Sequence, residues 1–384
     1  MSEQPLRRGP LLLAMNACMF IFGVVLLLMG ALLPQLHVSG NQAGSLGSLP
    51  LAGILAATIV VGPVLDKGGA KLVLGAALTM IAVALVAMAA FSSYAVVALA
   101  ALIYGFGGGI LNTATNALVS VVSPSGRGAA LNLLGCSFSL GGIAAPALMS
   151  FAAGRWPAST VLYALAALPA LALFLMLPLA FPRAPRAGTS IGTLLRGLDH
   201  PEVWLIGALL FFESGNENCM FVWAGKLSAD MLHLAASRAG FVLVALSAAL
   251  GIGRLLAAFA LKKLGSRGML LVASAIIFAG AIVVRMGSSF GPVLAGFALI
   301  GLGMSSVFPT ALGVAGDRFP GETGTVFGAI MTVALAGGTA GPAIGGWAAG
   351  FDPRAVMMVP LTASVAVAVL SFRAARHSFE NSSR

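Results

Sequence analysis

Long apolar runs separated by short polar stretches make up most of this chain. A helix needs about 20 apolar residues to cross the hydrocarbon core of a membrane. Charged residues, glycine and proline divide the chain into twelve runs of this kind. We predict a membrane-spanning helix in each run, at residues 11–36, 43–65, 70–92, 94–122, 129–153, 158–181, 202–225, 238–261, 268–287, 289–315, 323–350 and 355–374. The runs are much longer than the roughly ten residues of a membrane β-strand and do not alternate, so the pattern predicts an all-α membrane protein.

The longest polar stretch, residues 182–200, divides the twelve runs six and six. We therefore expect an N-terminal six-helix bundle at 1–181, a cytoplasmic linker at 182–200 and a C-terminal six-helix bundle at 201–384.

Composition supports a membrane protein and excludes most soluble classes. Charged residues make up 8% of the chain, whereas about 25% is usual in soluble domains. Hydrophobic residues reach 59% and the mean hydropathy is +1.02, so the lipid bilayer must be the main solvent of the chain. The net charge of +10 does not indicate nucleic-acid binding, because the basic residues lie singly between apolar runs rather than on one water-facing surface.

The distribution of Lys and Arg predicts the orientation in the membrane. Fifteen of these residues fall at the termini, in the linker or between spans on one side, five fall on the other side, and Arg254 lies within a span. Cytoplasmic loops carry the excess of basic residues. We therefore expect a multi-pass protein of the plasma (inner) membrane with both termini in the cytoplasm.

The two halves of the chain repeat one pattern at a constant offset of 196 residues. The matched pairs are Gly105 and Gly301, Gly107 and Gly303, Gly141 and Gly337, Gly142 and Gly338, Pro146 and Pro342, Lys67 and Lys263, and Lys71 and Arg267. Because the offset spans an even number of predicted helices, the halves have the same orientation and are parallel repeats. The glycines at 337, 341 and 345 have the spacing of a close helix contact, and we favour packing over a direct substrate role for them.

This plan resembles the major facilitator superfamily. The stretch from Gly62 through Asp66, Lys67 and Gly69 to Lys71 is similar to the family's signature between spans 2 and 3, with Ala70 in place of a usual base. The resemblance implies the major facilitator fold, alternating access, and a cytoplasmic gate in which Asp66 and Lys67 hold neighbouring helix ends.

A narrower resemblance points to the fucose-permease branch, which carries sugars together with protons. Residues 105–120, 127–146 and 211–223 are similar to spans 4, 5 and 7 of that branch. The branch has acidic groups on spans 1 and 4, where this chain has Asn16, Asn112 and Asn116 and no acid.

Two acidic residues fall in the middle of a predicted span. Glu213 and Glu217 are four residues apart and project from one face of a helix. A charge at the bilayer centre costs about 2.5–3.5 kcal/mol, so we predict that this pair binds the coupling ion, with Arg254 as counter-charge; a structural salt bridge is the alternative. Counted at about 1.5 Å per residue, Arg254 lies about 10–12 Å from the cytoplasmic end, Glu213 about 16 Å and Glu217 about 22 Å, which favours Glu213 as its partner.

Amide side chains supply candidate substrate contacts. Asn112 and Asn116 share one helix face, and Asn216 lies on the face of the glutamates. An amide offers both donors and an acceptor to a hydroxyl-rich solute, although hydrogen bonding between helices is the alternative. Trp223 is predicted to stack on a sugar ring or to lie in the aromatic belt at the membrane surface.

The remaining chemistry is sparse. The sequence has no phosphate-binding loop of the type that drives ATP-dependent transport, and its three cysteines lie inside apolar runs. We expect no catalytic residue, no cofactor, no metal site, no nucleic-acid partner and a monomer.

We predict a secondary transporter for a small polar solute, a sugar, coupled to protons. Sodium coupling or uniport stays open, but two carboxylates supply few of the oxygen ligands that a metal ion takes. The alternative function is an efflux antiporter for amphipathic compounds, which 22 Phe and 16 Met residues favour. An intramembrane enzyme or a sensor would need a reactive cluster or an added soluble domain. The sequence shows neither, so we do not favour these functions.

Overall fold

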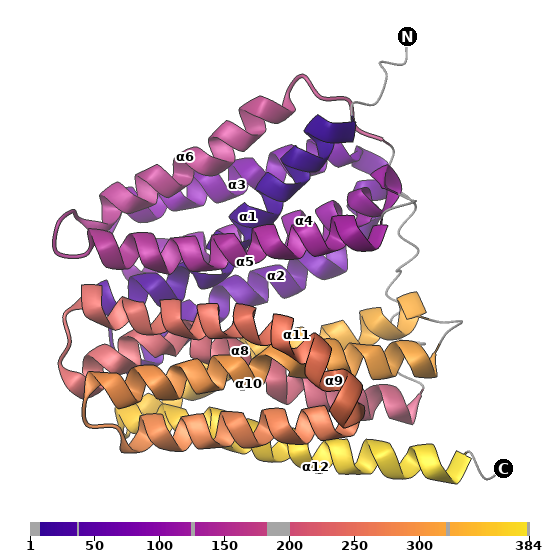
Figure 1. The fold of residues 1–384 in the computed structure, drawn as a ribbon. Helices are drawn as coiled ribbons and strands as arrows, with labels where there is room; N and C mark the ends of the chain where they lie inside the picture. The colour runs from indigo at the N-terminus through magenta and orange to yellow at the C-terminus, as the bar shows by residue number, and fades with distance from the viewer. Residues whose placement is uncertain (1–7, 37, 124–126, 183–199, 320–322, 382–384) are drawn as a thin grey trace. The chain divides into compact units, whose positions relative to one another are not determined.

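The computed structural model describes residues 8–36, 38–123, 127–182, 200–319 and 323–381, and every regular element in these ranges is helical (Figure 1). The helices are α1 (Arg8–Leu32), η1 (Leu33–Gln35), α2 (Gly40–Gly68), α3 (Ala70–Ala90), α4 (Tyr94–Val122), α5 (Arg127–Ala152), α6 (Ala158–Met176), α8 (Pro201–Leu232), α9 (Ala236–Met286), α10 (Phe290–Arg318), α11 (Thr323–Ala349), η3 (Pro353–Met357) and α12 (Met358–Asn381).

The predicted all-α membrane fold of twelve spanning helices is confirmed. Within the described ranges, eleven helical segments are long and apolar enough to cross a membrane. The twelfth span is α8, whose 32 residues are long enough but include Glu213, Asn216, Glu217 and Asn218. These polar side chains lower its hydropathy, so α8 crosses the membrane as the most polar of the spans.

The chain forms two compact units. One consists of Met1–Leu32 with Leu49–Ser190, and the other of Leu33–Ser48 with Ile191–Arg384. The boundary between residues 190 and 191 lies inside the predicted linker. The segment 33–48, which includes η1 and the first turns of α2, belongs to the second unit, where the backbone of Gly44 lies against that of Gly346 on α11.

Two predicted breaks between spans are shorter than expected. Spans 238–261 and 268–287 share the label α9 (Ala236–Met286), but they are two helices that meet at a kink, where Gly265 has the non-helical angles φ 65° and ψ 170°. The intervening Lys and Leu residues favour a helix, and no proline interrupts them. Asp66 and Lys67, predicted in a loop, belong to the last turn of α2, and Gly69 alone separates α2 from α3.

The parallel repeat is visible in the backbone packing of each unit. A Cβ atom on Gly107 of α4 would lie 2.9 Å from the carbonyl oxygen of Ala77 on α3. A Cβ atom on Gly303 of α10 would lie 2.9 Å from the carbonyl oxygen of Ala273 on α9. Both pairs are separated by the offset of 196 residues, so the sequence repeat corresponds to a repeated helix contact.

Candidate functional site

The polar face of α8 contains the most deeply buried acidic group of the described chain. Glu213 and Asn216 are both 0% exposed. Asn216 lies close enough to interact with the carboxyl group. Among the described residues, neither the two carboxyl oxygens of Glu213 nor the amide group of Asn216 has a partner in hydrogen-bond geometry. Buried polar groups are almost always paired. We therefore expect a proton, a water molecule or a solute to bind at these two side chains.

Glu217, one turn further along α8, has a counter-charge. Its Oε1 atom lies 4.0 Å from Nη2 of Arg254 on α9, and the two side chains are 16% and 39% exposed. The sequence-based choice of Glu213 as the partner of Arg254 was therefore wrong. Depth along a helix does not determine which side faces a neighbour, and residues four apart differ by about 40° in rotation, which is enough to turn Glu217 and not Glu213 towards Arg254.

The opposite side of α8 packs directly on α11. A Cβ atom on Gly337 would lie 2.1 Å from the carbonyl oxygen of Phe211, and one on Gly341 would lie 2.0 Å from that of Gly215. On the same side, Gly345 faces Cys219. The interpretation of these α11 glycines as packing residues is confirmed. This contact fixes the rotation of α8 and so keeps Glu213 and Asn216 away from α11.

Trp223 also belongs to this contact. Its ring is 1% exposed, and its indole N–H donates a hydrogen bond to the carbonyl oxygen of Pro342 at 3.1 Å. A buried indole needs such a partner. In this conformation a close contact with α11 covers the ring and keeps it out of an aromatic belt at the membrane surface. Stacking of Trp223 on a sugar stays a prediction.

Asn112 and Asn116 in α4 form a connected amide pair. The Nδ2 atom of Asn116 donates to the backbone oxygen of Asn112 at 2.8 Å and to its Oδ1 atom at 3.0 Å. Both side chains are partly exposed. The Nδ2 atom of Asn112 is a hydrogen-bond donor of the kind that binds hydroxyl groups. By contrast, Asn16 accepts a hydrogen bond from Ser137 of α5 at 2.7 Å, which ties α1 to α5.

Part of the predicted site lies outside the described side chains. The backbones of Asp66 and Lys67 are helical, but their side chains belong to the part of the chain whose placement is not described. Their gate role stays a prediction. Within the described ranges, no group of three His, Cys, Asp or Glu side chains is arranged to hold a metal ion.

Sequence reasoning missed that two equivalent bases each contact the end of the sixth helix of their own half, although by different interactions. The Nζ atom of Lys71 on α3 donates to the backbone oxygen of Leu177, just after α6. The guanidinium carbon of Arg267 on α9 lies 4.2 Å from the ring centroid of Phe372 on α12. Lys71 and Arg267 are a matched pair of the repeat, and Met176, next to Leu177, matches Phe372. The shared offset was a signal that both bases reach the last helix of their own half.

A buried carboxyl group beside an amide, with a second carboxylate and an arginine one turn away, can change charge when its surroundings change. Such a group inside a spanning helix is a candidate for an ion or solute pathway. Together with the repeated six-helix plan, it defines the class of protein as a membrane transporter.

The chain belongs to the Major Facilitator Superfamily, because the sequence pattern of that family matches residues 11–226 and 203–383. An uncharacterized MFS-type transporter of Yersinia pestis is 27% identical over 318 residues, which cover 80% of this chain and 77% of that protein. These findings confirm the predicted family.

Solved transporter structures have the same fold. A bacterial homologue of the human lysosomal transporter Spinster, inward-facing and unoccupied, superposes with a TM-score of 0.82 at 16% identity, covering 98% of each chain. The nucleoside transporter NupG has a TM-score of 0.77 at 17% identity, over 95% of this chain and 99% of its own. The Escherichia coli fucose:proton symporter FucP has a TM-score of 0.63 at 18% identity, over 94% and 98%.

Proposed function

We propose that this protein transports a small hydroxyl-bearing solute, a sugar, by proton-coupled alternating access. The observation that carries the proposal is the burial of Glu213 and Asn216 without hydrogen-bond partners among the described residues. Such burial is costly for an ionised carboxylate, so it favours a carboxyl group that holds a proton in this conformation.

Coupling follows from a change in the surroundings of Glu213. When the site opens and water reaches the carboxyl group, the ionised form is stabilised and the proton leaves. When the site closes, desolvation again favours the protonated form. A solute bound to Asn216 touches the neighbour of Glu213 and therefore senses which form is present, which links solute binding and proton binding reciprocally.

The Glu217–Arg254 pair provides a counter-charge that can be rearranged. The 4.0 Å separation and the partial exposure of both side chains are typical of a weak ion pair. A weak pair can open at small cost when Glu213 changes its charge. We propose that Arg254 is the counter-charge of Glu217 in this conformation and shifts towards Glu213 when that residue loses its proton.

The choice of a sugar rests on amide groups and on distant relatives. Asn112 and Asn116 offer donors and acceptors suited to hydroxyl groups. FucP is a fucose:proton symporter and NupG a nucleoside transporter by name, and both substrates carry several hydroxyl groups.

A thermal-shift panel of sugars, nucleosides and amphipathic drugs on the purified full chain tests the substrate class, since a bound ligand stabilises the folded state by mass action. The best sugar is then tested in proteoliposomes with an inward proton gradient. Glu213→Gln should abolish accumulation while leaving exchange of solute across the membrane. Asp230→Asn, a carboxylate at the end of the same helix that pairs with Lys226, is the matched control and should behave like wild type.

Accumulation by Glu213→Gln equal to that of wild type would overturn the coupling role. Stabilisation by amphipathic drugs and not by sugars would favour the efflux antiporter, and sodium-driven accumulation without a proton gradient would exclude proton coupling.

A further inference from the structure

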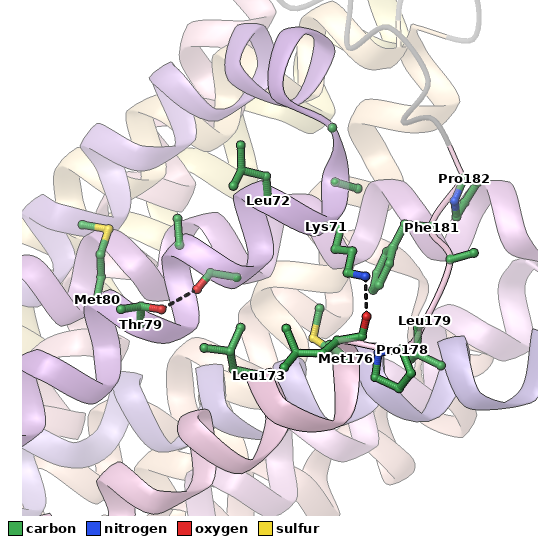
Figure 2. Close-up of a pocket in the computed structure, with 16 residues that line it drawn as sticks. Lys71, Leu72, Thr79, Met80, Leu173, Met176, Pro178, Leu179, Phe181 and Pro182 are labelled. Carbon is green, nitrogen blue, oxygen red and sulfur yellow. Dashed lines mark hydrogen bonds between the residues drawn. The ribbon is translucent and has the colours of Figure 1, made fainter. Parts of the chain in front are cut away.

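A large groove opens between α3 and α6 in the first unit, at the end where Lys71 lies (Figure 2). Its volume is about 1280 Å³, and its walls come from residues 69–80 of α3 and its N-terminal flank and from 173–182 of α6 and the segment after it. Pockets for drug-sized molecules have volumes of about 300–1,000 Å³. The groove therefore has room for a larger occupant.

The described walls of the groove are mostly apolar, with one cation and one threonine among them. Leu72, Met80 and Leu173 lie along it, and Figure 2 shows their side chains around the open space. The hydroxyl group of Thr79 donates to the backbone oxygen of Gly75 at 2.9 Å within its own helix. Lys71 is the charged residue among the described lining residues, so the described part of the groove combines a long apolar wall with a positive charge at one end.

The apolar walls continue onto surfaces that meet lipid. On α3, Leu72 is 69% exposed, and on α6, Phe174 and Leu175 are 68% and 58% exposed. In a spanning helix, exposed large apolar side chains of this kind are solvated by acyl chains rather than by water. The groove is therefore open to the bilayer along its length.

Lys71 retains capacity for an anion. Its ammonium group has three N–H donors, and one of them binds the backbone oxygen of Leu177, as the dashed line in Figure 2 shows. That oxygen is one of the carbonyls left without a partner where α6 ends, and Pro178 follows it. The bond holds the ammonium group at the mouth of the groove, and among the described residues its other two donors have no partner.

We propose that this groove binds one anionic glycerophospholipid, with its phosphate on Lys71 and an acyl chain along the apolar wall between α3 and α6. The predicted orientation places Lys71 at the cytoplasmic surface, where anionic lipids attract basic residues. A bilayer supplies this ligand at high local concentration. The groove belongs to the first unit and the polar face of α8 to the second, and the proposal does not depend on the nature of the transported solute.

The second repeat provides an internal control. Arg267 is the counterpart of Lys71, but its guanidinium group lies over the ring of Phe372. Met176 occupies the matching position in the first repeat and lines the groove. An arginine covered by an aromatic ring has less freedom to bind a phosphate, so loss of the Arg267 charge should not affect this site.

Native mass spectrometry of the full chain in an equimolar mixture of palmitoyl-oleoyl phosphatidylglycerol and phosphatidylethanolamine tests the proposal. We expect wild type to retain phosphatidylglycerol selectively. Lys71→Gln should lower that adduct about fivefold, the effect of one basic residue near an anionic surface, and Arg267→Gln should leave it unchanged. Equal losses in the two variants, or none in either, would overturn the proposal.

A second variant tests the groove rather than the charge. A Cβ atom on Gly75 would make an ordinary contact with Leu173 at 3.4 Å, so a side chain can begin here without a backbone clash, and Gly75→Leu is chosen to occupy the groove. It should remove the adducts of both lipids at this site.

A crosslinking experiment locates the lipid in wild type. A phosphatidylglycerol with a photoreactive acyl chain should crosslink to peptides covering 72–80 and 173–179. Crosslinks confined to other helices, or binding of inorganic phosphate that equals lipid binding, would contradict the lipid site.

Discussion

Gly69 and Gly265 lie 196 residues apart and adopt nearly the same backbone conformation. Gly69 has φ 75° and ψ 145°, and Gly265 has φ 65° and ψ 170°. Side chains rarely adopt this region, which glycine enters freely. Each glycine also lies two residues before a matched base, Lys71 or Arg267. The two halves therefore use the same backbone break to direct a cation from the start of their third span towards their sixth.

Replacement of either glycine should destabilise the protein through the backbone alone. A Cβ atom on Gly69 or Gly265 would meet no atom within 4 Å, so Gly69→Ala and Gly265→Ala test conformation without a clash. We expect a loss of about 1–3 kcal/mol for each, seen as a lower midpoint of thermal unfolding. Gly135→Ala is the control, because this glycine is helical in α5 and equally uncrowded; it should gain about 0.5–1 kcal/mol. Equal midpoints for all three variants would contradict the conformational argument.

The Glu217–Arg254 pair should matter more for coupling than for stability. Because both side chains are partly exposed and 4.0 Å apart, the coupling energy in a double-mutant cycle with Glu217→Gln and Arg254→Gln should be below about 1 kcal/mol. Both single variants should lose proton-driven accumulation. The cycle is measured by thermal unfolding and the accumulation in proteoliposomes. If Arg254→Gln fails to fold, or if the coupling energy is several kcal/mol, the salt bridge is architectural.

The amide pair in α4 should contribute to solute affinity. Asn112→Ala and Asn116→Ala should each weaken binding by about 1–3 kcal/mol if a buried hydrogen bond to the solute is lost. Isothermal calorimetry on the purified variants measures this. Asn16→Ala is the matched control, because Asn16 is bonded to Ser137 between two helices and should lower stability without changing affinity. Unchanged affinity in both α4 variants would assign the pair to helix packing.

Asp66 should control the rate of transport and not the binding of solute. It lies in the last turn of α2, just before the break at Gly69, where the family resemblance implies a gate that opens and closes with each cycle. Asp66→Asn should slow transport while equilibrium binding stays within a few-fold of wild type. Initial rates and calorimetry on the same preparation distinguish the two effects, and complete loss of binding by a folded variant would reject the gate role.

The fold could be predicted because the bilayer imposes a length on every span, and because the repeat places glycines at matched helix contacts. Local continuity was harder to predict. The stretch around Lys263 contains charge but no helix breaker except Gly265, so helical structure extends into the predicted loop and is broken only at Gly265. Charge indicates where the membrane ends, whereas the backbone ends a helix only where a residue cannot continue it.

The candidate site was predicted in part. The position of Glu213 within a span is sufficient to single it out, because an acidic residue is costly there. The partner of Arg254 and the burial of Trp223 depend on the rotation of α8, which is fixed by its contact with α11. The groove beside Lys71 depends on the spacing of α3 and α6, and no residue pattern encodes an empty space.

The packing of α8 on α11 has a mechanical consequence. Gly337 and Gly341 bring the two backbones into contact at Phe211 and Gly215, so neither helix can slide or roll on the other without collision. The two helices therefore form a rigidly packed pair, and Glu213 belongs to one of them. Under the proposed coupling, a proton that arrives on Glu213 would therefore displace two spanning helices together.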